Sequence, residues 1–280
     1  MLPVTGNRKP VTMVTFPSCK INLGLHILSR RPDGYHNIET CFYPVPWTDI
    51  LELIPAAKFS FTSTGIAIAG DAEQNLCVKA YRLLQRDFNF GEANLHLHKI
   101  IPAGAGLGGG SSDAASTLGL INQVFQLNLS LEKLKVYAAQ LGSDCAFFIE
   151  NRPMIGSGRG EVLQEIEVNL RGKFLVLVKP DIHVSTADAY AMVRPAQPEM
   201  DLRTVLNSGI QGWRHRLKND FELSVFQKFP EIASIKETLY NAGALYASMS
   251  GSGSSVFGIF EEQIDLKHQF PGTIYWSGNL

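Results

Sequence analysis

Apolar runs and alternating patterns in the first part of the chain predict β-strands. Residues 11–16 are rich in β-branched side chains, residues 20–28 are largely apolar, and residues 51–54 and 59–61 continue the pattern. The pair Asp33-Gly34 is a strong turn signal. The chain is therefore expected to begin with strands separated by turns.

The hydrophobic period changes to that of a helix near Asn75. The apolar residues at helical spacing there are Leu76, Ala80, Leu83 and Leu84. Residues 93–99 alternate as a strand does, and a glycine-rich stretch follows them. The next helical face is formed by Ala114, Leu118, Ile121 and Phe125. Because residues near its start are small, this helix can pack closely under the glycine-rich stretch, and we expect a core helix.

Another helix is predicted over residues 131–141. It is expected to stop at Gly142, and Ser143-Asp144 can begin the next segment. Asp144 therefore lies where a helix cap is expected.

A second αβ unit follows in the last third of the chain. Residues 173–178 form a buried strand pattern ended by Pro180, and helix and strand patterns then continue to residue 260. We place the domain boundary before this strand, which gives an amino-terminal domain of residues 1–168 and a carboxy-terminal domain of residues 169–280. The patterns alternate without a repeat, which indicates a mixed fold of the α+β class in two layers.

Composition limits the class of protein. The chain has 280 residues and a net charge of −1, so it can bury a large core and shows no sign of a nucleic-acid partner. No apolar run approaches the roughly 18 residues needed to span a bilayer, and residues 1–10 lack the apolar core of a signal peptide. The scattered cysteines indicate reduced thiols in the core, and a cytoplasmic protein is expected. They are Cys19, Cys41, Cys77 and Cys145.

The most informative stretch is residues 101–115, where five glycines fall within seven residues between a strand pattern and a helix pattern. Glycines tolerate positive φ and let the chain approach a ligand, so successive N–H groups can point at a phosphate. The next helix adds its dipole and unpaired N–H groups, with Ser111 or Ser112 as N-cap. A flexible surface loop is the alternative, but such loops seldom join two well-patterned elements so directly.

Three well-known phosphate loops do not fit these residues. A Walker A loop requires a lysine where Ser111 follows Gly110. The spacing G-x-G-x-x-G is present, but the acidic residue expected about 20 residues later at a strand end is not, since Glu132 lies in a helix start. A protein-kinase loop would be accompanied by H-R-D and D-F-G, which the sequence lacks.

Three motifs together resemble one superfamily. Residues 102–115 are similar to the phosphate loop of the galactokinase, homoserine kinase, mevalonate kinase and phosphomevalonate kinase superfamily. Residues 17–26 and the run Arg-Arg-Pro-Asp-Gly-Tyr-His at 30–36 resemble the amino-terminal signature of its 4-diphosphocytidyl-2-C-methyl-D-erythritol kinase branch. Residues 249–257 resemble the carboxy-terminal glycine-rich motif. The resemblance spans nearly the whole chain, in the expected order, and leaves out about the first ten residues.

This resemblance implies a two-domain small-molecule kinase fold with the active site between the domains. The amino-terminal domain is expected to resemble the second domain of ribosomal protein S5, and the carboxy-terminal domain is expected to be ferredoxin-like. ATP, with Mg²⁺, is implied as the phosphate donor. The implied acceptor is a cytidine diphosphate compound, phosphorylated at the 2-hydroxyl of 4-diphosphocytidyl-2-C-methyl-D-erythritol in the non-mevalonate route to isoprenoid precursors. Neither nucleic acid nor a membrane is expected as a partner, and the oligomeric state is open.

Lys20 and Asp144 are the candidate catalytic pair. The sequence pattern alone favours structural roles for both residues. The ammonium group of Lys20 would reach water from the end of a strand, and Asp144 would cap a helix. The resemblance implies that Asp144 takes the proton from the substrate hydroxyl. It also implies that Lys20 lies beside Asp144, holds the carboxylate ionised and offsets charge on the transferring phosphate.

Five residues are candidates for binding the acceptor. Asn22 shares a strand face with Lys20 and is a hydrogen-bond partner for the substrate. The resemblance implies that Tyr35 stacks on the cytosine ring and that His36 reads its polar edge, although a tyrosine beside a turn is usually packing. Tyr190 aligns as the opposite wall but is also a core candidate, and Thr186 is a further candidate contact.

The resemblance assigns ATP to the glycine-rich loop. Asn75 is similar to a family segment at the adenine site, although a polar residue at a helix start is the ordinary alternative. Residues 250–255 form either only a hairpin turn or a backbone nest facing the loop across a cleft. The magnesium ligands are open, with Ser112 and Asp144 as guesses. The expected ATP-binding loop residues are Pro102, Ala103, Gly104, Ala105, Gly106, Leu107, Gly108, Gly109, Gly110, Ser111 and Ser112.

Other functions are compatible with parts of the sequence. Homoserine or mevalonate kinases of the same superfamily have no cytosine to bind, so residues 30–36 argue against them. A non-catalytic nucleotide-binding protein would be favoured by the loss of Lys20 or Asp144, and both are present. The interpretation as a dinucleotide-dependent oxidoreductase is supported only by the spacing G-x-G-x-x-G.

Overall fold

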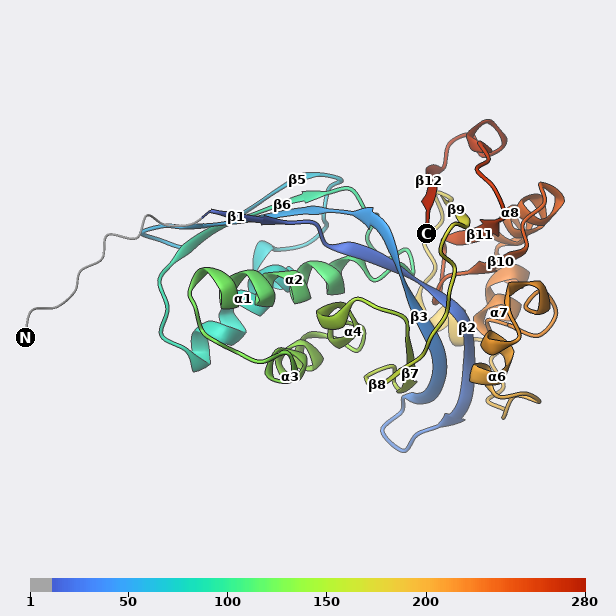
Figure 1. The fold of residues 1–280 in the computed structure, drawn as a ribbon, viewed down its shortest axis with the longest axis horizontal. Helices are drawn as coiled ribbons and strands as arrows, with labels where there is room; N and C mark the ends of the chain where they lie inside the picture. Colours follow the sequence, from blue (N-terminus) through green and yellow to red (C-terminus); the bar gives the residue numbers. More distant parts are fainter. Residues whose placement is uncertain (1–11) are drawn as a thin grey trace, which may run out of the picture.

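Residues 12–280 are described by the computed structural model, so the expectations for residues 1–11 lie outside the described part of the chain. The described residues form three four-stranded sheets with helices packed against them. Figure 1 shows a sheet with helices beneath it, a second group of strands and helices at the other end, and long strands running between them. The expected mixture of helices and strands is confirmed.

The amino-terminal sheet has the strand order β1-β4-β6-β5, in which β5 and β6 run parallel and the other neighbours are antiparallel. The helices α1, α2 and α3 bury their apolar faces against it in a single core. The bounds of these elements and of the adjoining α4 are β1 Met13–Thr15, β4 Ile50–Pro55, β5 Ser60–Gly65, η1 Ala72–Gln74, α1 Leu76–Asp87, β6 Ala93–Lys99, α2 Gly109–Val124, α3 Leu131–Leu141 and α4 Cys145–Glu150.

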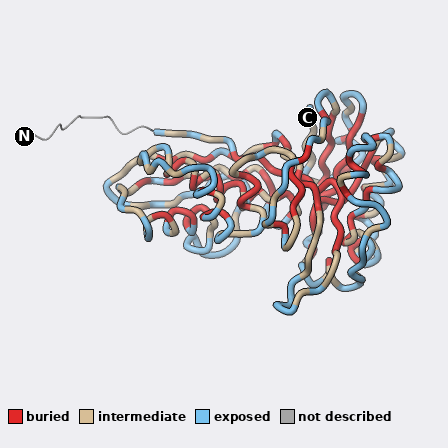
Figure 2. The backbone as a smooth tube through the Cα atoms, turned by 60° about the horizontal axis from the view of Figure 1, so that its bottom comes forward, coloured by how far each residue is buried: buried red, intermediate tan, exposed pale blue. Residues whose placement is uncertain are grey.

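The long strands β2 and β3 form an antiparallel sheet with β7 and β8. They are joined by a turn in which Gly34 has a φ of +85°, as the Asp33-Gly34 pair predicted. Residues 18–27 of β2 are all buried, because side chains of both halves cover the strand. Figure 2 shows buried backbone in red where the two halves meet. The bounds are β2 Ser18–Arg30, β3 His36–Thr48, β7 Met154–Gly158 and β8 Val162–Glu165.

The carboxy-terminal sheet is antiparallel and has the order β10-β11-β9-β12. If its strands are numbered one to four along the chain, their order across the sheet is two, three, one, four. The helices α7 and α8 pack in the same core. This is the arrangement expected of a ferredoxin-like domain, with its second helix reduced to η3. The bounds are β9 Phe174–Lys179, α5 Thr186–Tyr190, α6 Leu202–Asn207, η2 Ile210–Gly212, α7 Phe221–Lys228, α8 Pro230–Asn241, β10 Tyr246–Met249, β11 Val256–Phe260, η3 Lys267–Gln269 and β12 Ile274–Asn279.

One hydrophobic core crosses the predicted domain boundary at residues 168 and 169. It joins Ile21 of β2 and Leu107 of the glycine-rich loop to Leu177 of β9 and Phe257 of β11. The division of the chain into two domains at this point stays a prediction. Because the two halves share a close-packed core, residues contributed by each half are held in fixed relative positions.

The start of α2 corrects one sequence-based expectation. The helix was expected to have Ser111 or Ser112 as its N-cap, but it begins at Gly109 with Gly108 in the cap position. Gly108 has a φ of +69° and makes no side-chain cap, so both serines lie inside the first turn. The four cysteines are free and buried, as expected. None of the helices in residues 12–280 combines the length and apolar character needed to cross a membrane.

A buried group of charges closes the end of the amino-terminal sheet. The ammonium group of Lys99, at the end of β6, donates hydrogen bonds to the carboxylates of Asp49 and Asp113. Asp49 lies between β3 and β4 and also accepts the backbone N–H of Ile101 at 2.8 Å. All three charged side chains are almost completely buried. Two carboxylates therefore share one ammonium group, with very little exposure to solvent.

The sharing of one cation raises the cost of ionising Asp113. Burial, with the repulsion of Asp49 added, raises the pKa of Asp113 to about 7 against the attraction of Lys99. Burial alone would lower the pKa of Lys99, but the two carboxylates outweigh it and raise that pKa above 10.5. The oxygen Oδ1 of Asp113 has no hydrogen-bond partner within residues 12–280. The lysine is therefore always charged near neutral pH, whereas Asp113 titrates there.

This titration predicts that the protein becomes more stable as the pH falls from 8 to 6. The folded-state pKa of Asp113 lies above the ordinary value of 3.8, so between these values the folded protein holds a proton that the unfolded chain lacks. For one such group the gain in free energy of unfolding is about 1.4 kcal/mol over this range. Urea denaturation at pH 8 and pH 6 measures it.

The variant Asp113→Asn should lose this part of the pH dependence, because its amide does not titrate. Asp181→Asn removes an exposed aspartate as the matched control and should keep the slope of the wild type. An equal pH dependence in wild type and Asp113→Asn would contradict the assignment.

Candidate active site

The glycine-rich loop between β6 and α2 is shaped by close backbone contacts. Gly104, Gly106 and Gly108 all have positive φ values, between +63° and +78°. At Gly106 an added Cβ would lie 2.0 Å from the carbonyl oxygen of Ser250, so this position cannot carry a side chain without a shift of the backbone. The first N–H groups of α2 have no partner within the helix and lie at the positive end of its dipole. The loop and the helix together can bind phosphate.

The carboxy-terminal glycine-rich segment, residues 250–255, joins β10 to β11 and touches this loop directly. The hydroxyl of Ser250 donates to the carbonyl of Gly106 at 2.8 Å, and the N–H of Ser255 donates to the carbonyl of Ala105 at 3.2 Å. The side chains of Ala105 and Leu107 are buried in the core shared by the two halves. Loop and hairpin are thus in contact rather than on two sides of an open cleft, and at positions 105 and 107 only the backbone can reach a ligand.

Lys20 of β2 connects the loop to Asp144. Its Nζ donates to Asn22 Oδ1 at 2.6 Å and to the Gly106 carbonyl at 3.0 Å, and it lies 3.5 Å from Asp144 Oδ2. The lysine side chain is only 4% exposed. Burial lowers the pKa of Lys20, while the neighbouring carboxylate of Asp144 opposes this effect. The lysine is therefore a fixed donor, and it is not a side chain that reaches out to water.

Asp144 stands at the N-cap position of α4, but its side chain makes no capping hydrogen bond. Its Oδ1 accepts the hydroxyl of Ser143 at 3.0 Å, and its Oδ2 faces Lys20. The side chain is 26% exposed, so a ligand can reach it. The geometry leaves carboxylate lone pairs free for a proton or a cation.

Asn22 is tied into the same hydrogen-bond network. Its Oδ1 accepts from Lys20, and its Nδ2 donates to Thr40 Oγ1 on β3 at 2.9 Å. Ser250 Oγ lies 3.4 Å from the same Oδ1. One Nδ2 hydrogen therefore remains for a ligand, and the main effect of Asn22 in this structure is to orient the ammonium group of Lys20.

The aromatic candidates lie at the tip of the β2–β3 hairpin and at the end of α5. The ring of Tyr35 is 58% exposed, and the guanidinium of Arg159 lies 5.3 Å from its centroid. The ring of His36 stacks on Tyr190 with a centroid distance of 4.6 Å, and Tyr190 also packs edge to face with Phe221. A base can stack on that face of Tyr190 only after His36 turns away. Thr186, at the start of α5, is exposed, and its hydroxyl makes no hydrogen bond to any of residues 12–280.

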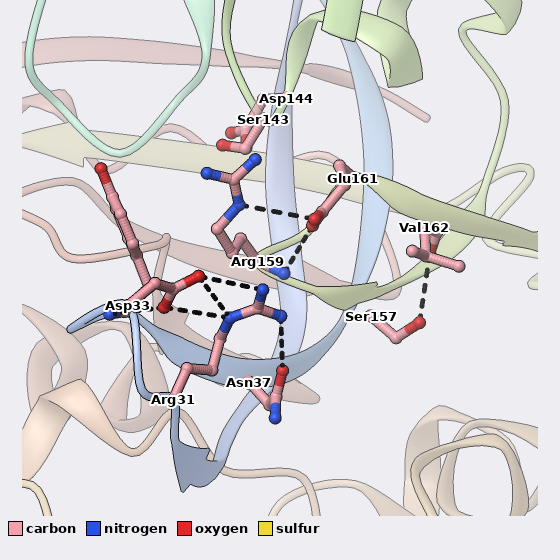
Figure 3. Close-up of polar contacts among 10 residues, drawn as sticks. Arg31, Asp33, Asn37, Ser143, Asp144, Ser157, Arg159, Glu161 and Val162 are labelled. Carbon is pink, nitrogen blue, oxygen red and sulfur yellow. Dashed lines mark hydrogen bonds and ion pairs between the residues drawn. The ribbon is translucent and has the colours of Figure 1, made fainter.

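Arg159 was missed by the sequence analysis. In Figure 3 its guanidinium lies between the Arg31–Asp33 turn and the Ser143–Asp144 segment, with Nε 3.4 Å from Glu161 Oε1. It comes from the connection between β7 and β8. A single arginine between two glycines carries no spacing signal, so only the fold shows that it faces the same space as Asp144.

Asn219 was also missed, although it holds the carboxy-terminal hairpin. Its Nδ2 donates to the carbonyls of both Met249 and Gly251 at 2.8 Å, and its Oδ1 accepts the N–H of Phe221 at 3.0 Å. In the sequence, an asparagine before an aspartate and a helix pattern indicates only a cap. The structure shows that it fixes the hairpin that touches Gly106.

Asn75 lines a cavity of about 310 Å³ beside the glycine-rich loop. Its Oδ1 accepts the N–H of Cys77 at 2.9 Å as the N-cap of α1, so the ordinary alternative holds as well. Ala103 and Gly110 of the loop line the same cavity, as do Lys99 and Asp113. The cavity is therefore next to the glycine-rich loop, and Lys99 and Asp113 are further candidate contacts that spacing alone did not reveal.

Metal binding depends on which oxygen, nitrogen and sulfur side chains lie close together. Residues 12–280 contain no group of three or more His, Cys, Asp or Glu side chains placed to hold an ion. Mg²⁺ commonly takes only one or two protein ligands and completes its shell with phosphate oxygens and water. The exposed carboxylate of Asp144 fits that mode.

Comparison with known proteins identifies the family. Residues 75–152 match the model described as the GHMP kinases N terminal domain, and residues 205–270 match GHMP kinases C terminal. A 4-diphosphocytidyl-2-C-methyl-D-erythritol kinase of Cytophaga hutchinsonii is 50% identical over 92% of this chain and 96% of its own. The protein of the same name from Bacteroides thetaiotaomicron is 51% identical over 93% and 97%.

Solved structures agree. A crystal structure of 4-(cytidine 5'-diphospho)-2C-methyl-D-erythritol kinase superposes with a TM-score of 0.82 at 30% identity, covering 95% of this chain and 98% of the other. The mevalonate kinase of Methanococcus jannaschii, at 10% identity, has a TM-score of 0.71 over 96% and 98% and shows the shared fold. The expected two-domain small-molecule kinase fold is confirmed. The chain belongs to the 4-diphosphocytidyl-2-C-methyl-D-erythritol kinase family of the GHMP kinases.

Proposed function

We propose that the protein transfers the γ-phosphoryl group of ATP to the 2-hydroxyl of 4-diphosphocytidyl-2-C-methyl-D-erythritol. The observation that carries this proposal is the contact of Lys20 with both the carbonyl of Gly106 in the phosphate loop and the carboxylate of Asp144. A fixed cation and a reachable carboxylate beside a phosphate loop are the parts that transfer to an alcohol requires. The names of the relatives supply the acceptor.

ATP binding is assigned to the glycine-rich loop and its neighbouring cavity. The adenine ring would occupy the cavity of about 310 Å³ lined by Asn75, and the phosphates would lie against the backbone of residues 102–112. Mg²⁺, when bound with ATP, would add positive charge at the β- and γ-phosphates, with Asp144 and Ser112 as the proposed protein ligands. Lys20, next to Asp144, would offset charge on the transferring group.

In the transfer step, Asp144 accepts the proton of the substrate hydroxyl as the hydroxyl oxygen bonds to the γ-phosphorus. The bond from that phosphorus to the β–γ bridging oxygen breaks, and ADP leaves with this oxygen. Lys20 lies 3.5 Å from the carboxylate of Asp144 and remains beside the reacting groups during the step. Asn22 holds the lysine in place through its 2.6 Å hydrogen bond and has one N–H left for the acceptor.

The acceptor side is assigned to the hairpin tip and α5. Tyr35 offers an exposed ring face for the cytosine, worth about 1–3 kcal/mol of stacking free energy but not specific for the base. His36 would supply the hydrogen bonds that read the base, which requires it to leave the face of Tyr190. Arg159, next to Tyr35 and facing Asp144, is placed to pair with the diphosphate between base and alcohol. Thr186 stays a candidate contact of lower rank.

Phosphorus NMR with ATP and magnesium tests the proposal. The cytidyl compound, mevalonate and homoserine are offered separately. A new monophosphate resonance is expected with the cytidyl compound alone, because the other two lack a base and a diphosphate for Tyr35 and Arg159. Transfer to mevalonate or homoserine would contradict the acceptor assignment, and binding of ATP without any transfer would favour a non-catalytic protein.

Asp144→Asn should lower kcat by about 10²–10⁴-fold, because the amide cannot take the proton. The variant should still fold, and it should still bind ATP in calorimetry without magnesium, since the Asp144 side chain caps nothing. Unchanged turnover would exclude a catalytic role, and a large loss of stability would return Asp144 to a structural one.

Arg159→Gln should raise the KM for the cytidyl compound by about tenfold or more with little change in the KM for ATP. A charge-assisted hydrogen bond is typically worth about 1.5–3 kcal/mol, and only the acceptor lies near Arg159. Arg152→Gln, which also loses a guanidinium paired with carboxylates, is the matched control. Equal effects of the two substitutions on steady-state kinetics would contradict the contact.

A further inference from the structure

A second and larger cavity, of about 1030 Å³, lies along the outer edge of β2. Its walls are the connections around residues 191–200 and 215–223, and neither Lys20 nor Asp144 lines it. Both walls are fixed to the strand. Ala196 N–H donates to the carbonyl of Ile27 at 3.0 Å, and Leu25 N–H donates to the carbonyl of Lys218 at 2.8 Å. The cavity is thus a feature of the fold, separate from the proposed active site.

The lining of this cavity carries uncompensated positive charge. Arg194, Arg216 and Lys218 line it, and none of them has a carboxylate within 4 Å among residues 12–280. Of the acidic residues in the lining, Glu222 is bound to Lys236 at 2.6 Å, and Asp220 accepts the N–H of Ile27 at 2.8 Å.

Glu199 is the third acidic residue of the lining and forms no ion pair in the described chain. Asp220 also lacks a lysine or arginine partner, so three cations face two carboxylates, and the remaining charge of +1 favours an anionic ligand.

His26 adds a largely buried polar side chain to the wall of the cavity. It lies in the wall of the cavity on β2, its side chain is 9% exposed, and it makes no hydrogen bond to any residue of the described chain. Its nearest carboxylate oxygen, Oδ1 of Asp220, is 3.8 Å away, which is too far for a hydrogen bond. The ring nitrogens of His26 are not among the fully buried atoms that lack a partner, so water or a polar atom of a ligand in the cavity can reach them.

Apolar side chains face the same cavity from both walls. Met192 and Met200 lie on one connection and Leu223 on the other, and all three are among the exposed large hydrophobic residues of the protein. Single exposed apolar residues are ordinary, but three around one cavity form a patch that a ligand could cover. Methionine side chains also adapt readily to the shape of an apolar ligand.

We propose that this cavity binds a small soluble amphiphile, an ester of phosphate or diphosphate with a short apolar chain. Arg194, Arg216 and Lys218 hold the anionic group, and Met192, Met200 and Leu223 cover the chain. The volume suits a drug-sized ligand. The proposal does not depend on the kinase reaction, and it assigns to the protein a second ligand site at which no phosphoryl transfer takes place.

The test is isothermal titration of the intact protein with octyl phosphate below its micelle concentration. Saturable binding with one site is expected. Inorganic phosphate and 1-octanol, titrated separately, should each bind at least tenfold more weakly, because each offers only half of the ligand. Equal affinity for inorganic phosphate would overturn the apolar half of the proposal, and absence of binding at millimolar octyl phosphate would overturn the whole.

Variants locate the site. Arg216→Gln/Lys218→Gln should weaken octyl phosphate binding by at least tenfold, and Leu223→Ser should weaken it severalfold while leaving inorganic phosphate unaffected. The matched control Lys58→Gln/Arg171→Gln removes the same charge from exposed positions outside the cavity and should bind as the wild type does. Equal loss in the two double variants would show that only net charge matters and would contradict the site.

Two further measurements distinguish this cavity from the ATP site and from a lipid-binding surface. Binding that persists when the glycine-rich loop is saturated with ATP supports a separate cavity, and competition with ATP would overturn it. Sedimentation with phosphatidic acid vesicles, without binding of monomeric octyl phosphate, would assign the anion to a lipid surface and reject the soluble ligand.

Discussion

The ammonium group of Lys99, held between Asp49 and Asp113, is the interaction on which the phosphate loop depends. Lys99 ends β6 just before the loop, and Asp113 lies in α2 just after it, so their 2.7 Å contact closes the loop at its base. Asp49 joins the end of β3 to the same point through Lys99 and the N–H of Ile101. Removing the ammonium group of Lys99 would leave two buried carboxylates without a cation, and breaking a buried pair in this way typically costs about 3–5 kcal/mol. The contacts of Lys99 with these two carboxylates thus hold the two ends of the loop together.

On its other side, the loop is held by the hairpin at residues 250–255 and by the strand β2. Lys20 donates to the carbonyl of Gly106, and the hairpin at residues 250–255 occupies the space where a side chain at Gly106 would lie. The strand β2 carries Lys20 and Asn22 at one end and His26 further along. The register of β2 against β3 shifts between Leu23 and Leu25, so the two stretches of the strand present different faces to their surroundings. A single strand therefore serves both the proposed active site and the separate cavity.

The spacing of hydrophobic residues and the positions of glycines were enough to predict most helices and strands. Most of these elements bury one face in the core, and glycines mark the turns between them. The strand at residues 93–99 and the helix at 131–141 match β6 and α3. The N-cap of α2 was missed because Gly108 ends the loop in a left-handed conformation that leaves the serines inside the helix. The contact of Lys20 with Asp144 joins residues 124 positions apart and came only from the family resemblance. Arg159 and Asn219 act through tertiary contacts that no local pattern records.

Asn219 raises the question of whether the cavity and the active site influence each other. It lines the cavity, and its amide holds the carbonyls of Met249 and Gly251 in the hairpin that touches Gly106. A chain of contacts is not itself a coupling, because a ligand shifts an equilibrium only by the difference between its affinities for two arrangements. Asn219 is buried with all its hydrogen bonds made, and the hairpin is packed against the loop, so a second arrangement would have to break several of these bonds at once. The physical expectation is that a ligand in the cavity binds without changing turnover.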